Sequence, residues 1–292
     1  MENFSYHAPG DVAEAVRLLE SAGPGGRVLA GGTDLLVQLK HEPLGIEHVV
    51  DIKRIEELDQ LGATGDGGFR IGAAVSCARV GEDTALAARW PGVREAAMLI
   101  GSDQIQSRAT IAGNLCNASP AADTTPALLA AGAECEIAGP GGRRRLPVAA
   151  FLTGVGTNAL AAGELLVAIH LPAPPPRTAD AYQRFIPRNE MDIAVVGVGA
   201  QLTLAEDGTC LAARIGLGAV GPTVIDAADS AGRLIGTKLA EADLNAAIEE
   251  ARAAARPISD KRGPADYRRS LVGTLLRRVV QEAAHRAANA PA

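Results

Sequence analysis

Ala30-Gly31-Gly32-Thr33-Asp34 is the stretch that decides the interpretation of this chain, together with Thr110-Ile111-Ala112-Gly113-Asn114. Glycine lacks a Cβ atom, so it reaches left-handed conformations and lets backbone N–H groups approach an anion closely. The Thr, Asp and Asn residues in these stretches add short hydrogen-bonding side chains. The pair therefore predicts two loops that close on one diphosphate, as in a site for a nucleotide cofactor.

The first glycine stretch joins a strand to a helix. Arg27 to Ala30 is a short β-type run, and Asp34 can cap a helix that continues to Pro43. Asp11 and Glu14 form a capping pair for an earlier helix that ends at Gly23, and a further β-type run covers His48 to Ile52. Residues 1–58 are therefore predicted to form a βαβ-like lobe with the glycine turn at the carboxyl end of a strand.

Residues 59–175 are predicted to form a second lobe, which begins with the turn-rich segment 62–68 and contains the second glycine stretch. A helix is expected from Pro91 to Ile100, and Asp123, Thr124 or Thr125 can cap another helix opened by Pro126. Arg143-Arg144-Arg145 follows a glycine-rich turn and is interpreted as a solvated hairpin arm. The remaining predictions are a strand at 69–73, a helix capped by Ser76, and strands at 134–137 and 165–171.

The proline run 172–176 is the clearest linker, because prolines cannot join a sheet ladder. A third lobe, 176–292, offers antiparallel strands at 182–186, 195–204 and 212–219, followed by two helices. In the last helix, Leu271, Leu275, Leu276 and Val279 form one apolar stripe, and Arg268, Arg277 and Arg278 are expected on the outside.

Composition excludes several classes of protein. The 292 residues are 47% hydrophobic and 21% charged with a net charge of −6, which argues against binding to nucleic acid or to an anionic membrane. No run approaches the length of a membrane span and the first residues lack a signal-peptide pattern, so a cytoplasmic protein is expected. The four cysteines and five histidines are scattered, which predicts reduced thiols and no metal or iron–sulfur site on this chain.

Five longer stretches carry a resemblance to a known family, namely Leu29–Leu35, Thr110–Asp123, Met191–Val195, Gly218–Thr223 and Tyr267–Arg269. On these markers the chain resembles, over almost its full length, the flavin-binding medium subunit of the xanthine dehydrogenase and carbon monoxide dehydrogenase family of molybdenum hydroxylases. The resemblance implies an α+β fold, in which a PCMH-type two-lobed FAD-binding domain precedes a C-terminal lobe of three-stranded antiparallel sheet plus helices.

The resemblance also implies a function. The chain would be the FAD-binding electron-transfer subunit of an oxidoreductase, taking electrons from iron–sulfur clusters and passing them through FAD to an external acceptor. Molybdopterin would belong to a large partner subunit and the 2Fe-2S clusters to a small one, in a dimer of heterotrimers. Neither the substrate of the complex nor the acceptor follows from this sequence.

The resemblance places FAD between the first two lobes and carries individual contacts over to this chain. Asp123 would bind the flavin's sugar-like chain, although the residues alone also fit a helix cap. Arg184 would lie near the flavin pyrimidine edge or the diphosphate, or be a surface arginine. Asp34 would repel a diphosphate unless it caps its helix or bonds a hydroxyl, and the cap is favoured. The implied FAD-binding residues are Leu29, Ala30, Gly31, Gly32, Thr33, Asp34, Leu35, Leu36, Ile100, Thr110, Ile111, Ala112, Gly113, Asn114, Asp123, Leu165, Leu166 and Arg184.

Ala112 departs from the family pattern, which has glycine there. The backbone at Ala112 is therefore expected to avoid left-handed angles or to carry strain of about 1 kcal/mol or more. Two other functions fit the same fold. One is an independent FAD-dependent reductase or oxidase, and the other is a flavin-free assembly subunit.

Overall fold

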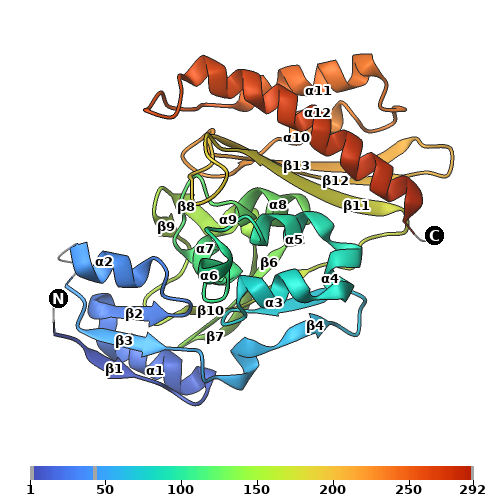
Figure 1. Cartoon of the computed structure of the whole chain (residues 1–292). Helices are drawn as coiled ribbons and strands as arrows, with labels where there is room; N and C mark the ends of the chain where they lie inside the picture. The colour runs from blue at the N-terminus through green and yellow to red at the C-terminus, as the bar shows by residue number, and fades with distance from the viewer. Residues whose placement is uncertain (1–2, 42–44, 291–292) are drawn as a thin grey trace.

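The computed structural model describes residues 3–41 and 45–290, and three successive sheets organise this part of the chain (Figure 1). In Figure 1 the first sheet lies at the lower left, the second in the middle and the third near the top, beneath the long C-terminal helix. The sheets have the strand orders β1-β3-β2, β4-β5-β10-β6-β7 and β11-β12-β13-β14, and β8 pairs with β9 in a small hairpin. The α+β class is confirmed.

The described strands are β1 (Ser5–His7), β2 (Gly26–Leu29), β3 (His48–Asp51), β4 (Leu61–Ala63), β5 (Phe69–Gly72), β6 (Glu134–Gly139), β7 (Gly142–Pro147), β8 (Leu152–Gly154), β9 (Thr157–Asn158), β10 (Leu165–Leu171), β11 (Thr178–Phe185), β12 (Val196–Leu204), β13 (Cys210–Gly218) and β14 (Ile225–Asp226). The described helices are α1 (Val12–Ala22), α2 (Leu35–His41), α3 (Cys77–Glu82), α4 (Thr84–Arg89), α5 (Pro91–Ala97), α6 (Asp103–Gln106), α7 (Ile111–Cys116), α8 (Thr124–Ala130), α9 (Val148–Phe151), α10 (Ala228–Gly232), α11 (Glu241–Ala254) and α12 (Ala265–Asn289). Two short 3₁₀ helices are η1 (Gly23–Gly25) and η2 (Glu56–Asp59).

The first sheet is parallel and forms the predicted βαβ-like lobe. The Asp11 carboxylate caps α1 by accepting from the Glu14 N–H at 2.7 Å, and Gly23 ends the helix with φ +52°. β3 pairs with β2 as expected, and also with β1, which the sequence did not predict. Pro43, the predicted end of α2, lies outside the described residues.

The second sheet is antiparallel, with β10 between β5 and β6. The turn-rich segment at 62–68 is a hairpin, because β4 pairs with β5 across it. The helix predicted from Pro91 to Ile100 ends at Ala97, and the next residues form turns before Gly101, whose φ is +58°.

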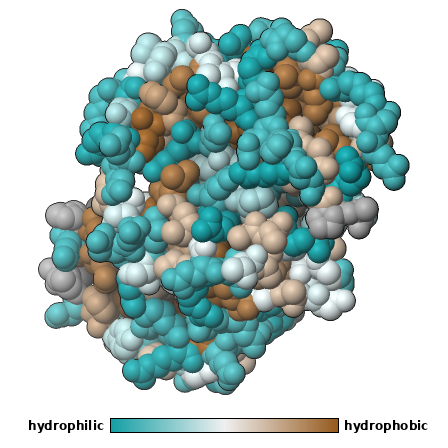
Figure 2. Space-filling view, turned by 45° about the vertical axis from the view of Figure 1, so that its right-hand side comes forward, coloured by the Kyte–Doolittle hydropathy of each residue, from teal (hydrophilic) through white to brown (hydrophobic). Residues whose placement is uncertain are grey.

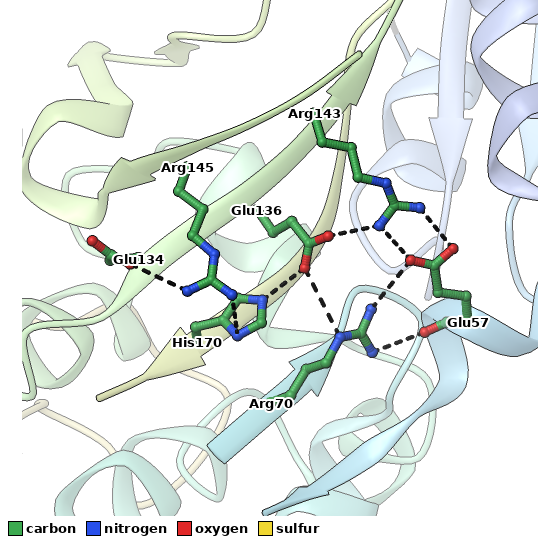
Figure 3. A network of polar contacts seen from close by, with 7 residues as sticks. All are labelled: Glu57, Arg70, Glu134, Glu136, Arg143, Arg145 and His170. Atoms are coloured by element: carbon green, nitrogen blue, oxygen red, sulfur yellow. Dashed lines mark hydrogen bonds and ion pairs between the residues drawn. The ribbon is translucent and has the colours of Figure 1, made fainter. Parts of the chain in front are cut away.

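The outer face of this sheet carries a network of charged side chains (Figure 3). Arg143 on β7 donates two hydrogen bonds to the Glu57 carboxylate, at 2.5 and 2.8 Å, and a third to Glu136 at 2.6 Å. His170 contacts Glu136 at 2.7 Å from the other side. Because these contacts hold η2 against β6 and β7, the arginine run is a paired hairpin arm, as predicted.

The third sheet is packed between helices on both faces. α12 and α10 lie against one face, with α11 packed on these two helices, and α8 of the second lobe lies against the other face. Glycines make the contact with α8 close: a Cβ atom added at Gly199, Gly216 or Gly218 would lie 2.5–2.6 Å from atoms of Pro126. The structure also adds a two-residue strand, β14, to the three predicted strands and a short helix, α10, to the two predicted helices.

Arg268 was predicted on the outside of the last helix, and this prediction is wrong. Its side chain is 3% exposed and donates to the carbonyl oxygens of Val195 and Ala219, at 3.2 and 3.4 Å. The same guanidinium donates to the Asp260 carboxylate at 2.5 Å. Arg268 therefore satisfies backbone acceptors where β12 begins and β13 ends, a role that the apolar stripe of the helix could not reveal.

The surface seen in Figure 2 is mostly hydrophilic, with apolar residues in small separate groups. Within the described residues, no helix is both long enough and apolar enough to cross a membrane. One large core joins the first two lobes and includes the Phe69–Trp90 ring contact, with centroids 5.8 Å apart. The third lobe has a core of its own.

Candidate functional site

A cavity of about 510 Å³ lies between the first and second lobes. One wall comes from the end of α1, β2, the first glycine stretch and α2, and the other from α7 and the start of β10. Both glycine stretches therefore open into the same space. The predicted residues that line it are Ala30, Gly31, Gly32, Thr33, Asp34, Leu35, Ile100, Thr110, Ala112, Gly113, Asn114, Leu165 and Leu166.

The first glycine stretch packs, at Gly31, against the two residues that immediately precede the second stretch. A Cβ atom at this position would lie 2.1 Å from the carbonyl oxygen of Arg108 and 2.9 Å from the Cα of Ala109. Only glycine allows this approach, because both neighbours are backbone atoms. At Gly32 the reason is conformational, since its φ is +78° and an added Cβ would meet the Leu29 side chain at 2.9 Å.

Asp34 lies at the turn before α2, but its carboxylate does not cap that helix. Instead the N–H groups of Val37 and Gln38 donate to the Asp34 carbonyl, and within the described residues its side chain accepts no hydrogen bond. Partial burial raises the pKa of this carboxyl above its ordinary value. The favoured cap is thus wrong, and the carboxylate faces the cavity without a protein partner.

The second glycine stretch is a helix start rather than a loop. The Thr110 hydroxyl accepts from the Gly113 N–H at 2.9 Å and caps α7. Ala112 lies inside this helix and is absent from the residues with positive φ. The backbone at Ala112 therefore avoids left-handed angles, which was the first of the two expectations. The alternative, backbone strain, does not arise, because alanine is the residue that helices favour most.

Several lining residues were not predicted. The segment 160–164 lines the cavity up to the predicted Leu165 and Leu166, and the first wall extends back from the glycine turn through Arg27 to Gly23. The Cys116 thiol also borders the cavity, and burial raises its pKa to about 12, so it stays protonated. No local motif marked these residues, because their place depends on how the lobes meet.

Five predicted residues do not line the cavity. Leu29, Leu36 and Ile111 belong to the elements that form its walls, but their side chains lie elsewhere. Asp123 and Arg184 are buried together instead, with Arg184 donating to the Asp123 carboxylate at 2.5 Å. The Tyr182 hydroxyl donates to the same carboxylate at 3.1 Å, so β11 is bound to the start of α8. Asp123 has helical backbone angles and provides no side-chain cap, contrary to the cap interpretation.

The stability of the chain should depend on pH through Asp123. Burial raises the pKa of Asp123 to about 6, against the opposing effect of the Arg184 charge. Because the folded chain then holds the proton more tightly than the unfolded chain, this stabilising contribution is complete below about pH 4 and is lost by about pH 6. The free energy of unfolding of the wild type, relative to Asp123→Asn, should fall by a few kcal/mol over this range. Urea unfolding across pH 4–7 measures it, and parallel curves for the two proteins would contradict the assignment.

The described cysteines are all free thiols, as predicted, and the described residues contain no group of three or more His, Cys, Asp or Glu side chains that could hold a metal ion. The cavity instead offers backbone N–H groups, small side chains and an apolar surface. Such a site suits an extended organic ligand with an anionic centre.

Comparisons with known proteins agree with this geometry. Residues 2–174 match the family described as the FAD binding domain in molybdopterin dehydrogenase, and residues 181–283 match the CO dehydrogenase flavoprotein C-terminal domain. The carbon monoxide dehydrogenase medium chain of Afipia carboxidovorans is 36% identical, covering 98% of this chain and 99% of that protein. The putative xanthine dehydrogenase FAD-binding subunit of Escherichia coli is 34% identical, with 96% and 95% covered.

Solved structures are similar over the same length. The reconstituted CO dehydrogenase from Oligotropha carboxidovorans contains a chain that is 36% identical and superposes with a TM-score of 0.93, covering 98% of this chain and 99% of that one. A chain of quinoline 2-oxidoreductase from Pseudomonas putida 86 is 30% identical, with a TM-score of 0.90 and coverage of 98% and 99%.

Proposed function

Since the chain belongs to the family of FAD-binding medium subunits of xanthine dehydrogenase and carbon monoxide dehydrogenase, we propose that its interlobe cavity holds FAD for electron transfer within a molybdenum hydroxylase complex. As a member of this family the chain is an oxidoreductase subunit with FAD as its cofactor. The observation that carries the proposal is that both glycine stretches line one cavity, with Gly31 packed against the Arg108 backbone just before the second stretch.

The residues of the cavity fit a dinucleotide. Gly31, Gly32 and Thr33 present backbone N–H groups beside α2, where a diphosphate can bind without a lysine. The unpartnered carboxylate of Asp34 suits a sugar hydroxyl, because a hydroxyl can donate to it while the phosphates remain on the glycine backbone. Ile100, Leu165 and Leu166 supply apolar surface for a ring. We propose as FAD contacts the predicted residues that line the cavity.

Arg184 and Asp123 take a different role in this proposal from the one the resemblance implies. The two side chains neutralise each other and lie outside the lining of the cavity. We propose that with Tyr182 they hold the third lobe in place beside the FAD site. The division into units at 1–58, 59–175 and 176–292 is likewise proposed, and it follows the boundaries between the three sheets.

When bound, FAD supplies both one- and two-electron chemistry, and the protein supplies binding, orientation and electrostatic tuning. The described residues contain no cysteine cluster for iron–sulfur ligation. The proposal therefore assigns the 2Fe-2S clusters to a small partner subunit and molybdopterin to a large one, in a dimer of heterotrimers. This chain would hold FAD between the clusters and an external acceptor.

The decisive experiment is to purify the chain alone and together with the products of neighbouring genes. Stoichiometric flavin absorbance, bleached by substrate only in the complex, is the expected result. Bleaching of the lone chain by NAD(P)H or a substrate would favour an independent reductase or oxidase. The absence of flavin from both preparations at micromolar FAD would favour an assembly subunit and overturn the proposal.

A further inference from the structure

The arginine run of β7 divides its contacts between two faces of the second sheet. Arg143 and Arg145 point into the charged network on the outer face, as Figure 3 shows. Because neighbouring side chains of a strand point to opposite faces, Arg144 between them points the other way. Its hydrogen bonds go to the segment 159–164 instead. The middle arginine therefore serves a different part of the molecule from its two neighbours.

Arg144 holds this segment at both of its ends. Nε and Nη2 donate to the Glu164 carboxylate at 2.8 and 2.7 Å, and Nη2 also donates to the Ala159 carbonyl oxygen at 2.7 Å. The Glu164 carboxylate accepts from the Ala161 N–H at 2.7 Å as well, and the Glu164 N–H donates to the Ala161 carbonyl oxygen at 3.0 Å. The segment is thus a closed turn that one guanidinium bridges from outside.

The turn that Arg144 holds is part of the wall of the interlobe cavity. Residues 160–164 line the cavity directly before Leu165 and Leu166, whereas Arg144 is not a lining residue. Loss of the Arg144 side chain would therefore remove no contact with the contents of the cavity. It would act on the site only by allowing the wall to move.

The turn fits closely against the hairpin that carries Arg144. A Cβ atom added at Gly163, whose φ is +78°, would lie 3.1 Å from the Pro140 side chain between β6 and β7. A Cβ atom added at Gly139 would lie 2.5 Å from the Cγ atom of Glu164. These glycines let the turn pack directly on the hairpin, and the guanidinium of Arg144 fixes it there.

The pair of Arg144 and Glu164 is stronger than an ordinary surface ion pair. Exposed pairs contribute little, but this one is bidentate and the Glu164 side chain is 14% exposed. The hydrogen bond from Arg144 also lowers the pKa of the Glu164 carboxyl below its ordinary value, so the carboxylate is ionised at neutral pH.

We propose that Arg144 is a positioning residue for the FAD site, which holds the cavity wall at 159–164 in the arrangement that binds the cofactor. The inference rests on the proposed function. Glu164 transmits the effect, because its carboxylate accepts from both the Arg144 guanidinium and the Ala161 N–H. An exposed arginine on an edge strand thereby contributes to a site that it does not contact.

The test compares Arg144→Met with Arg143→Met, its neighbour on the same strand. The two side chains are 40% and 45% exposed, and each donates two hydrogen bonds to one glutamate. Glu164, the partner of Arg144, lines the cavity, and Glu57, the partner of Arg143, does not. Calorimetric titration of the flavin-free full-length chain with FAD should show about tenfold weaker binding for Arg144→Met, as for loss of a charge-assisted hydrogen bond, and wild-type binding for Arg143→Met.

Hydrogen–deuterium exchange of the flavin-free chain gives a second readout, which needs no bound cofactor. Arg144→Met should accelerate exchange at the amides of Ala161 and Glu164, and Arg143→Met should leave both at the wild-type rate. Arg144→Lys keeps the charge without the planar fork, so its affinity for FAD should lie between those of the wild type and Arg144→Met. Thermal unfolding of each variant verifies that the hairpin remains folded.

Two results would overturn the positioning role while leaving the proposed function in place. One is wild-type affinity for FAD in Arg144→Met. The other is an equal loss of affinity in Arg143→Met, which would show that any weakening of the hairpin has the same effect. A wild-type chain that binds no FAD, alone or with its partners, would overturn the proposed function and the positioning role together.

Discussion

Gly31→Ala is expected to abolish retention of FAD by the purified chain. The added Cβ would lie 2.1 Å from the Arg108 carbonyl oxygen and 2.7 Å from its carbonyl carbon, and backbone atoms cannot turn aside as a side chain can. The glycine stretches would have to separate, which opens the cavity at the point where both face the diphosphate. Overpacking of this kind also costs about 1–3 kcal/mol of stability. Flavin absorbance after gel filtration and urea unfolding measure the two effects.

Two other glycines provide controls for this prediction. Gly65→Ala adds a Cβ with no atom within 4 Å, so flavin content and stability should both match the wild type. Gly113→Ala adds a methyl group to the cavity wall, where its protein neighbour within 4 Å is the Thr110 hydroxyl at 3.0 Å. That variant should fold normally and bind FAD more weakly. Stoichiometric FAD in Gly31→Ala would refute the proposed role of the close approach of Gly31 to Arg108 in shaping the FAD site.

Arg268→Met is expected to lower the free energy of unfolding by about 3 kcal/mol, because it removes a buried guanidinium that donates several hydrogen bonds. The substitution keeps much of the apolar volume but removes the donors to Val195 and Ala219, so two carbonyl oxygens at the end of the sheet lose their partner. It also removes the partner of Asp260. Denaturant unfolding of the full-length chain is the measurement.

Arg269→Met is the matched control, because Arg269 is the next residue on the same helix. Its side chain is 39% exposed and its partner, Asp266, is 95% exposed, so the ion pair is worth less than about 1 kcal/mol. A similar loss of stability in the two variants would contradict the prediction, because it would mean that the buried contacts of Arg268 stabilise the fold no more than an exposed ion pair does. FAD content should change little in Arg269→Met.

Elements with local signals were predictable from the sequence. The capping residue and the terminal glycine of α1 lie within the helix itself or next to it, and the glycine turn after β2 follows from residues in sequence. β1 could not be predicted in the same way, because its three residues become a strand only by pairing with β3 more than forty residues later. Hydrophobic periodicity over so short a segment does not distinguish a strand from a loop.

The residues of the candidate site also differ in whether a local sequence signal predicts them. The two glycine stretches were recognisable from their residues and family pattern, and the Thr110 hydroxyl could have indicated a helix start by its spacing from Gly113. Tyr182 and Arg184, which donate to the Asp123 carboxylate, come about sixty residues later in the chain and lie on the third sheet. No local motif marked Arg27 as a residue of the cavity, because an arginine near the start of a strand is common. Its place in the lining depends on segment 161–164, which comes more than 130 residues later.

The close packing of α8 against the third sheet means that the proline run 172–176 is a poor place to cut the protein. All seven residues of α8 are buried, so this helix has no side suited to solvent. A truncated chain ending at 175 would uncover the face of α8 around Pro126 that the glycines of the third sheet cover in the full chain. Such a fragment would expose a contiguous apolar surface and aggregate, because exposed patches of this kind promote association. The flavin-binding half is therefore not an autonomous module, and fusions or exchanges between relatives should transfer both halves together.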